Sequence, residues 1–200
     1  MTIKEICNIL KSKLYNNGFE YGFIVDGRKY KPNMKNGFDN DYYHLSITVY
    51  TVQDPSVTLK EKIGTCVDAV LVMKSILDSL NVSSKIWLLY NKKKNKVHTI
   101  LTFEAESKII YLELTPQSSK AWYGQEIVYP SEQEFLLTYE NSDYDISDVT
   151  NMIVVGPAYE IPVSDSGRWH TSQSPGLSAG KPHPGNRRRP APVGGHRNRW

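Results

Sequence analysis

Cys66 is the residue of this sequence that is best placed to act as a nucleophile. It lies in the stretch Gly64-Thr65-Cys66-Val67-Asp68, immediately before a run of apolar residues at helical spacing. In the first turn of a helix, backbone N–H groups and the positive end of the helix dipole favour a thiolate. Gly64 would let the backbone approach closely, and the N–H of Cys66 would donate to an oxyanion. A buried structural cysteine is the alternative, and position alone does not decide between the two.

A base and an orienting acid follow on two successive strand-like runs. His98 lies on the first run and Glu113 on the second, and a short polar segment between them predicts a tight hairpin turn. If the turn is centred on Ala105-Glu106, His98 is directly opposite Glu113, on one face of the sheet with Cβ atoms roughly 5 Å apart. A slip of one residue would separate the pair. The carboxylate would fix the imidazole tautomer and stabilise the imidazolium, although each residue alone also has a purely structural explanation.

The segments that must position these side chains predict an α+β domain. Thr2 and Glu5 match a capping box, and Asn16-Asn17-Gly18 would end the helix that it starts. A second helix is expected over residues 66–80, which have a broad apolar face. The other expected elements are a hairpin turn at Asp26-Gly27, a loop at 31–41, strands at 43–52, 84–90, 97–104 and 108–115, a helix with a Ser131–Glu134 capping box, and a candidate last strand within 151–163.

The chain of 200 residues is long enough for one domain followed by a tail. We expect a catalytic domain over residues 1–163 and a disordered tail over 164–200, because Pro and Gly make up 11 of the last 35 residues. Those 35 residues carry seven basic side chains and no acid, whereas the first 165 carry 17 basic and 21 acidic ones, a net charge of −4. This abrupt change of composition resembles a fusion, a read-through or a cloning scar.

The composition gives little support to a nucleic-acid or membrane partner. Arg187–Arg189 would suit a nucleic-acid-binding arm, whose salt-dependent affinity would be lost on deleting residues 166–200, but a short basic run is usually a solvated segment. The first 165 residues lack the interleaved aromatic and basic residues of RNA-binding sheets. No apolar run approaches the length of a membrane span, and the N-terminus lacks a signal-peptide core. We therefore expect a cytoplasmic protein.

No metal or cofactor is expected. A zinc site would need Cys66, His98 and a third ligand such as His44 or Cys7, and no pair of these residues has the close spacing of zinc motifs. A calcium loop of the form D-x-[DN]-x-[DN]-G is missing from the sequence. Cys7 and Cys66 provide neither a CxxC pair nor a disulfide framework, and Cys7 falls among apolar residues of the first helix, where a packed thiol explains it.

Taken together, these residues resemble the transglutaminase-like superfamily of papain-like cysteine enzymes, in its small bacterial and phage form. The resemblance consists of Gly64-Thr65-Cys66-Val67-Asp68 opening a helix, His98-Thr99 on a strand, and Glu113 on the next strand. It covers residues Tyr42 to Tyr139 and implies a nucleophile helix packed on an antiparallel sheet. The superfamily often has Asp followed directly by Pro at the third position, whereas here Glu113 precedes Thr115-Pro116 by two residues.

The resemblance implies that Cys66 is the nucleophile, that His98 is the general base and then the acid, and that Glu113 orients His98. The thiolate would attack an amide carbon, and water or a second amine would resolve the resulting thioester. The expected enzyme is a peptidase, amidase, deamidase or transamidase acting on a peptide or protein amide, and the sequence does not choose among these. A catalytically inactive binding module of the same fold is the alternative.

Four further residues are candidates for supporting roles in this site. Gln53, in the turn Gln53-Asp54-Pro55, is a candidate second oxyanion donor, although a surface glutamine explains it as well. Gly64 and Asp68 belong to the nucleophile motif, and Asp68 would cap the helix or support the site without taking part in a chemical step. Trp122 would form a wall of the cleft, and an ordinary core or surface tryptophan explains it equally well.

Overall fold

A five-stranded antiparallel sheet is the centre of the fold. The structure is a computed structural model that describes residues 1–32, 40–116 and 121–157. The strand order is β10 (Tyr144–Asp148), β6 (Ser84–Asn91), β7 (Lys96–Ala105), β8 (Lys108–Leu112) and β9 (Glu126–Tyr129). The expected meander is therefore confirmed for the strands at 84–90 and 97–104, and the strand expected at 108–115 ends at Leu112, with Glu113 in an isolated bridge. The strands β9 and β10 were not predicted. The expected tail, the domain boundary at residue 163 and most of the expected loop at 31–41 lie outside the described residues.

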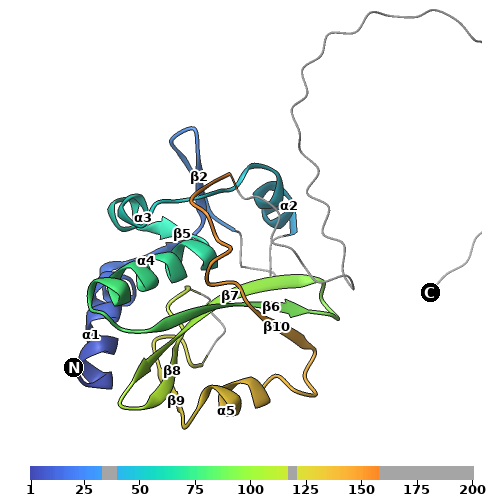
Figure 1. Cartoon of the computed structure of the whole chain (residues 1–200). Helices are drawn as coiled ribbons and strands as arrows, with labels where there is room; N and C mark the ends of the chain where they lie inside the picture. The colour runs from blue at the N-terminus through green and yellow to red at the C-terminus, as the bar shows by residue number, and fades with distance from the viewer. Residues whose placement is uncertain (33–39, 117–120, 158–200) are drawn as a thin grey trace, which may run out of the picture.

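Two helices cover one face of this sheet. Helix α4 (Cys66–Ser79) lies across β6 and β7, and α1 (Ile3–Lys13) lies beside it (Figure 1). Their buried side chains form one core with Leu88, Leu101 and Ile110 of the sheet. The Thr2–Glu5 capping box at the start of α1 is confirmed, since the Glu5 N–H donates to the Thr2 hydroxyl and the Thr2 N–H to the Glu5 carboxylate. The architecture is α+β, with α4 packed on an antiparallel sheet, as the sequence predicts.

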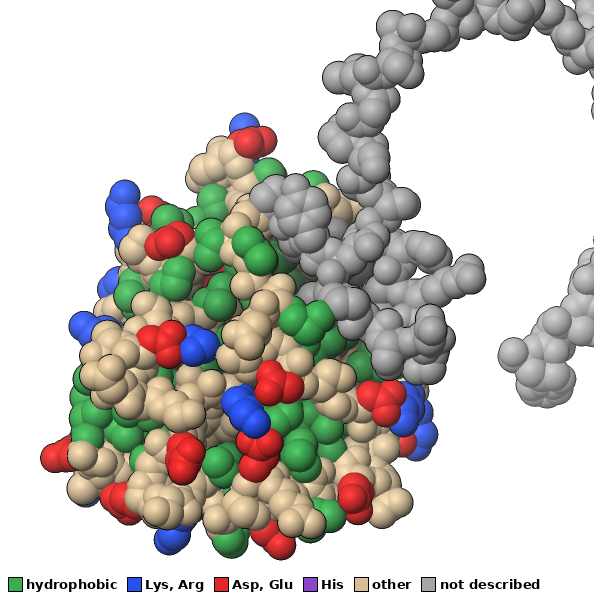
Figure 2. Space-filling view, viewed as in Figure 1, with side chains coloured by type: hydrophobic (Ala, Val, Ile, Leu, Met, Phe, Trp, Pro, Cys, Tyr) green, Lys and Arg blue, Asp and Glu red, His purple; other side chains and the backbone are tan. Residues whose placement is uncertain are grey.

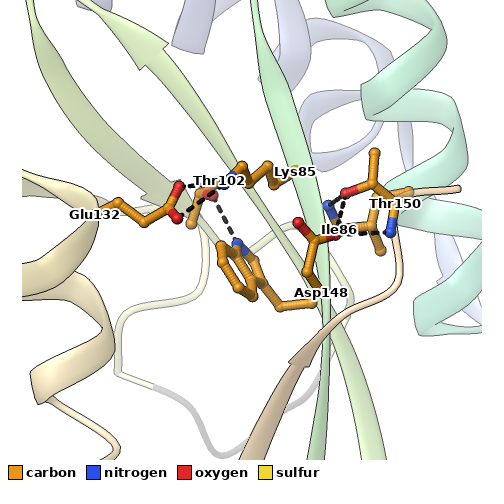
Figure 3. Close-up of polar contacts among 7 residues, drawn as sticks. Lys85, Ile86, Thr102, Glu132, Asp148 and Thr150 are labelled. Atoms are coloured by element: carbon orange, nitrogen blue, oxygen red, sulfur yellow. Dashed lines mark hydrogen bonds and ion pairs between the residues drawn. The ribbon is translucent and has the colours of Figure 1, made fainter.

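The short helix α5 (Glu132–Leu137) covers part of the opposite face. Phe135 is fully buried there among side chains of the sheet, including Trp87 and Ile100. Figure 3 shows the Lys85–Glu132 ion pair (2.7 Å) that links β6 to the start of α5. The expected Ser131 cap is confirmed in part, because its hydroxyl accepts from the Glu134 N–H at 3.2 Å, whereas no return bond from the Glu134 side chain is seen.

The turn after β10 is fixed by polar contacts that Figure 3 also shows. The Thr150 hydroxyl accepts from the Ile86 N–H at 2.9 Å, and Asp148 accepts from the Thr150 N–H at 2.9 Å. On the face of the sheet that α5 covers, the Trp87 indole N–H donates to the Thr102 hydroxyl at 2.8 Å. The Trp87–Thr102 bond pairs two buried polar groups, and the bonds of Thr150 fix the partly exposed end of the sheet.

The smaller elements surround the N-terminal end of α4. Two of them form the predicted hairpin, β2 (Phe23–Val25) with β3 (Arg28–Tyr30), whose turn residues Asp26 and Gly27 have φ of 49° and 75°, as a type I′ turn requires. The α-helical part of the first helix ends at Lys13, followed by η1 (Tyr15–Asn17) and a left-handed Gly18. The remaining elements are β1 (Glu20–Tyr21), α2 (Asn40–Val49), β4 (Thr51–Val52), α3 (Pro55–Glu61), β5 (Ile63–Gly64) and β11 (Gly156–Pro157).

The prediction of a strand over residues 43–52 is wrong for most of its length. Residues 40–49 form helix α2, and only Thr51–Val52 pair as a strand. The β-branched residues favour a strand only weakly, and tertiary packing overrides that preference. Tyr42 is buried against Phe23, with ring centroids 5.0 Å apart, and the Thr48 hydroxyl donates back to the Leu45 carbonyl at 2.8 Å. The candidate last strand within 151–163 is described only to residue 157, and β11 is its only strand there.

The register predicted for the β7–β8 hairpin is also wrong, by two residues. Ala105 pairs with Lys108, so the turn consists of Glu106 and Ser107, which both have positive φ (53° and 55°). Such angles make a two-residue turn whose twist suits the flanking strands. A displacement by two residues keeps every side chain on its original face. His98 and Glu113 therefore still lie on one face of the sheet, although they are not directly opposite.

The described surface mixes charges of both signs. Figure 2 shows acidic and basic side chains interspersed with apolar ones over the face that it presents. Several of them form ion pairs, such as Lys11–Glu126 at 2.8 Å and Lys92–Asp145 at 2.7 Å. Among the described residues, no helix is both long enough and apolar enough to cross a lipid bilayer.

Candidate active site

The start of α4 is held in place by the buried carboxylate of Asp68. Asp68 has an exposed fraction of 0% and accepts from the Thr65 N–H (2.7 Å), the Gln53 N–H (2.8 Å) and the Tyr50 hydroxyl (2.9 Å). A Cβ at Gly64 would lie 2.6 Å from the Asp68 Cβ, so only glycine fits there. This arrangement fixes the backbone immediately before Cys66. Asp68 therefore supports the helix start, a role that the sequence predicted for it.

Gln53 is part of the same support. Its amide nitrogen donates to the Ile63 carbonyl at 3.0 Å and to the Asp68 carboxylate at 3.3 Å. Because both amide N–H groups are used in this way, we infer that Gln53 positions β5 and Asp68. The predicted role of Gln53 as an oxyanion donor would require this side chain to change its partners.

Cys66 lies beside the edge of β7 where β8 no longer pairs with it. The β7–β8 ladder ends at Thr102–Tyr111. The Glu104 N–H donates to the Ser83 carbonyl, on the side of β6. In an antiparallel ladder successive backbone N–H groups alternate in direction, so the Thr99 N–H, five residues earlier, is directed away from β6. The Thr99 N–H and hydroxyl instead form hydrogen bonds with the Cys66 sulfur. The sulfur therefore takes the place of a neighbouring strand at this point.

His98 connects Cys66 to Glu113. The His98 Nε2 is 2.7 Å from the Glu113 Oε2, and the imidazole also has a hydrogen bond with the Cys66 thiol. Because Nε2 is used by the carboxylate, Nδ1 is the ring nitrogen available to the sulfur. The structure thus brings together the three residues that the sequence predicts as nucleophile, base and orienting acid.

Glu113 is held by two further donors. Its Oε1 accepts from the Thr115 N–H at 3.0 Å, and its Oε2 accepts from the Tyr111 hydroxyl at 2.8 Å in addition to His98. The side chain is only 3% exposed. These donors compensate for the burial of the Glu113 side chain and hold it beside the imidazole.

The electrostatics of the site favour a thiolate–imidazolium pair. Burial by itself raises the pKa of the Cys66 thiol, but the hydrogen bond and charge of His98 and the donors of Thr99 lower it below its ordinary value. Burial by itself lowers the pKa of His98, but the Glu113 carboxylate and Cys66 raise it to about 9. The thiol therefore loses its proton more easily than an ordinary cysteine, and the imidazole keeps its own to higher pH, so both shifts favour the charged pair.

Trp122 lies next to Glu113 rather than at a distance from the site. Residue Tyr123 forms a parallel bridge with Glu113, and the Gly124 N–H donates to the Glu113 carbonyl at 2.9 Å. Trp122 is 42% exposed, and its indole forms a hydrogen bond with the Tyr111 hydroxyl. Its predicted role as a cleft wall stays a prediction, but its link to Tyr111 is a contact that the sequence did not indicate.

Three residues of the site have contacts for which the sequence predicts no role, namely Tyr50, Tyr111 and Thr99, the last of which belongs to the His98-Thr99 motif. Tyr111 carries a usable signal, because it precedes Glu113 by two residues on a strand and so shares its face. Thr99 follows His98 directly, but its importance depends on where β8 stops pairing. Tyr50 follows helix α2, which sequence propensity predicts as a strand.

The other candidate ligands do not join this site. Cys7 is buried in α1, and burial raises its pKa to about 11. His44 lies on the exposed side of α2. Among the residues that the structure describes, no three His, Cys, Asp or Glu side chains are arranged to hold a metal ion.

Neither a protein-family model nor a curated protein matches the chain. The site is therefore defined by its own geometry: a thiol at a helix start, an imidazole within hydrogen-bond reach, and a buried carboxylate that orients the imidazole. Cys66 of α4 is hydrogen bonded with Thr99 of β7. Glu113 accepts from the Tyr111 hydroxyl and the Thr115 N–H.

Replacing Asp68 by asparagine is expected to destabilise the domain by about 2 kcal/mol. Either orientation of the amide would direct an NH₂ group at donors that Asp68 now accepts from, such as the Thr65 N–H and the Tyr50 hydroxyl. The free energy of unfolding in urea measures the effect. Asp78→Asn is the matched control, because Asp78 lies on the same helix in an exposed pair with Lys74 and should change stability by less than about 0.5 kcal/mol. Equal effects of the two substitutions would contradict the proposed support role of Asp68.

Proposed function

We propose that this protein is a cysteine-dependent acyl-transfer enzyme that acts on an amide bond of a peptide or protein, with a papain-like fold of the transglutaminase-like type. The observation that supports it best is the hydrogen-bonded series Cys66–His98–Glu113, with the carboxylate 2.7 Å from the imidazole. A nucleophile, a base and an orienting group in this order make up the general arrangement of covalent acyl transfer.

In the first half-reaction, the Cys66 thiolate attacks the carbonyl carbon of the amide. A C–S bond forms, the carbonyl π electrons move to oxygen, and the Cys66 N–H, which belongs to the first turn of α4, would donate to that oxyanion. The His98 imidazolium then gives its Nδ1 proton to the departing nitrogen as the C–N bond breaks. The products are an amine or ammonia and a thioester on Cys66.

In the second half-reaction, neutral His98 takes a proton from water or from a second amine. The resulting nucleophile attacks the thioester carbon, the C–S bond breaks, and the thiolate of Cys66 is restored beside the imidazolium. Water yields a hydrolase, and an amine yields a transamidase. Glu113 keeps the imidazole oriented throughout and does not exchange a proton with the substrate.

The pH dependence of alkylation by iodoacetamide tests this proposal without a known substrate. We expect Cys66 to react with an inflection well below pH 8.5, the approximate pKa of an ordinary thiol, since His98 and Thr99 lower its pKa. Cys7 is an internal control in the same sample, because burial raises its pKa to about 11. Mass spectrometry of the digested protein gives the rate at each cysteine. A rate at Cys66 that follows an ordinary thiol, or no reaction at all in the folded protein, would contradict the proposal and favour an inactive binding module.

A further inference from the structure

We infer that Tyr111 and Trp122 are positioning residues of this enzyme, and that together they keep Glu113 oriented toward His98. This inference rests on the proposed function. Neither side chain belongs to the proposed series of nucleophile, base and acid, and their role is to hold the orienting acid, Glu113, in place.

Tyr111 shares with His98 the oxygen of Glu113 that faces the imidazole. Its hydroxyl donates to Oε2 at 2.8 Å, and the His98 Nε2 is 2.7 Å from the same atom. The Thr115 N–H occupies the other oxygen at 3.0 Å. With both oxygens occupied, the carboxylate cannot rotate away from the imidazole without breaking a hydrogen bond in a buried environment.

Trp122 extends the hydrogen bonds of Glu113 and Tyr111 to the protein surface. An indole N–H can only donate, so in its hydrogen bond with Tyr111 the phenol oxygen is the acceptor. The phenol is thereby left with its own O–H directed at Glu113. The bridge between Glu113 and Tyr123 fixes the backbone next to Trp122, so the indole is held although 42% of the residue is exposed.

Among the described residues, the other titratable groups near this network are three phenols and the Asp68 carboxylate, which accepts from the Tyr50 hydroxyl and whose pKa is raised by burial. Tyr123 and Tyr139 lie near Glu113, and Tyr50 lies near Cys66. Burial raises the pKa of all three phenols above the ordinary value, and that of Tyr111 as well. They therefore stay protonated over the pH range in which the thiol and imidazole change state.

Removing the Tyr111 hydroxyl should make the site less able to hold a thiolate. A carboxylate that loses a donor in a buried site binds a proton more readily, so part of the imidazolium would give its proton to Glu113. The thiolate of Cys66 then loses part of the positive charge that stabilises it. We expect Tyr111→Phe to move the inflection of Cys66 alkylation to higher pH by about one unit, a roughly tenfold lower rate on the acid side.

The experiment measures Cys66 alkylation against pH in wild type, Tyr111→Phe, Trp122→Phe and the double variant. Trp122→Phe keeps an aromatic ring and should give a smaller shift in the same direction. If Trp122 acts through the Tyr111 hydroxyl, the double variant should equal Tyr111→Phe alone, which is a non-additive result. Tyr129→Phe is the matched control, because its phenol lies on the same sheet face and is hydrogen bonded with Thr138 instead.

The outcomes separate this inference from the proposed function. An inflection in wild type that is unaffected by His98→Ala would overturn the proposed function itself. An inflection that depends on His98 but is the same in wild type and in a folded Tyr111→Phe variant would overturn the positioning role alone. Fully additive shifts, or an equal shift in Tyr129→Phe, would show that general loosening of the sheet is responsible. Near-ultraviolet circular dichroism of each variant establishes that it is folded.

Discussion

Replacing Cys66 by alanine is expected to abolish acyl-enzyme formation. With p-nitrophenyl acetate as the acyl donor, the wild-type thiolate should attack the ester carbon and release p-nitrophenolate in a burst, with the acetyl group retained on Cys66 as a thioester. Alanine offers no nucleophile, and the loss of steady turnover should be at least about 10³-fold. An activated ester is a suitable probe because its leaving group does not need a proton from His98.

The measurement is the burst amplitude of p-nitrophenolate, together with the mass of the peptide that contains residue 66. Cys7→Ala is the control, and it should keep the full burst because Cys7 is buried in α1 and its pKa is raised to about 11. A burst of normal amplitude in Cys66→Ala would show that another group is the nucleophile, and the proposed mechanism would then be wrong.

Replacing His98 by alanine is expected to have the second largest effect, and replacing Glu113 by alanine a smaller one. Without the imidazolium, burial is left to raise the pKa of Cys66, opposed only by the donors of Thr99. Alkylation at pH 6 should therefore fall by about 10²-fold or more in His98→Ala, because the rate follows the thiolate fraction. Glu113→Ala keeps the imidazole and should retain clear residual turnover of p-nitrophenyl acetate.

The direction of the pH effect follows from which group loses its proton first. Wild-type alkylation should rise as pH passes the lowered pKa of Cys66, and in His98→Ala the same rise should occur at higher pH. Transfer from an amide needs the imidazolium as well, so amide turnover should decline as pH rises past about 9, where His98 loses its proton. Identical alkylation profiles in wild type and His98→Ala would mean that the two side chains do not interact in solution.

The helix that begins at Cys66 was predictable because several independent signals agree on it. The motif Gly64-Thr65-Cys66-Val67-Asp68 has an N-cap threonine, an acid three residues later and a broad apolar face after it. The order of the three central strands was also predictable, since each is rich in β-formers and separated from the next by a polar turn.

The juxtaposition of His98 with Glu113 was predicted correctly from a wrong register. The predicted and the observed pairing of the hairpin differ by two residues, and side chains two residues apart on a strand point to the same face of the sheet. An error of one residue would have separated the pair. The position of the turn depends on which two residues adopt positive φ. Asp26-Gly27 is a strong sequence signal for such a turn, whereas Glu106-Ser107 is not.

Helix α2 and the contacts around Glu113 were not accessible from the sequence. Residues 43–52 favour a strand locally, and only the packing of Tyr42 on Phe23 makes the helix preferable. The sequence places Tyr111 on the same face as Glu113, but the hydrogen bonds that Tyr111 makes with Glu113 and Trp122 depend on the path of the chain beyond the end of β8. Long-range contacts of this kind have no local pattern.

The point where β8 leaves β7 also makes the pKa of the Cys66 thiol depend on the folded state of the chain. The Thr99 N–H that reaches the Cys66 sulfur belongs to the backbone, so only proline at residue 99 would remove it, and it reaches the sulfur only when β6, β7 and α4 are assembled. A nascent or partly unfolded chain would carry an ordinary thiol at residue 66. The lowered pKa of Cys66 is thus a property of the folded chain, and it is lost whenever α4 separates from β7.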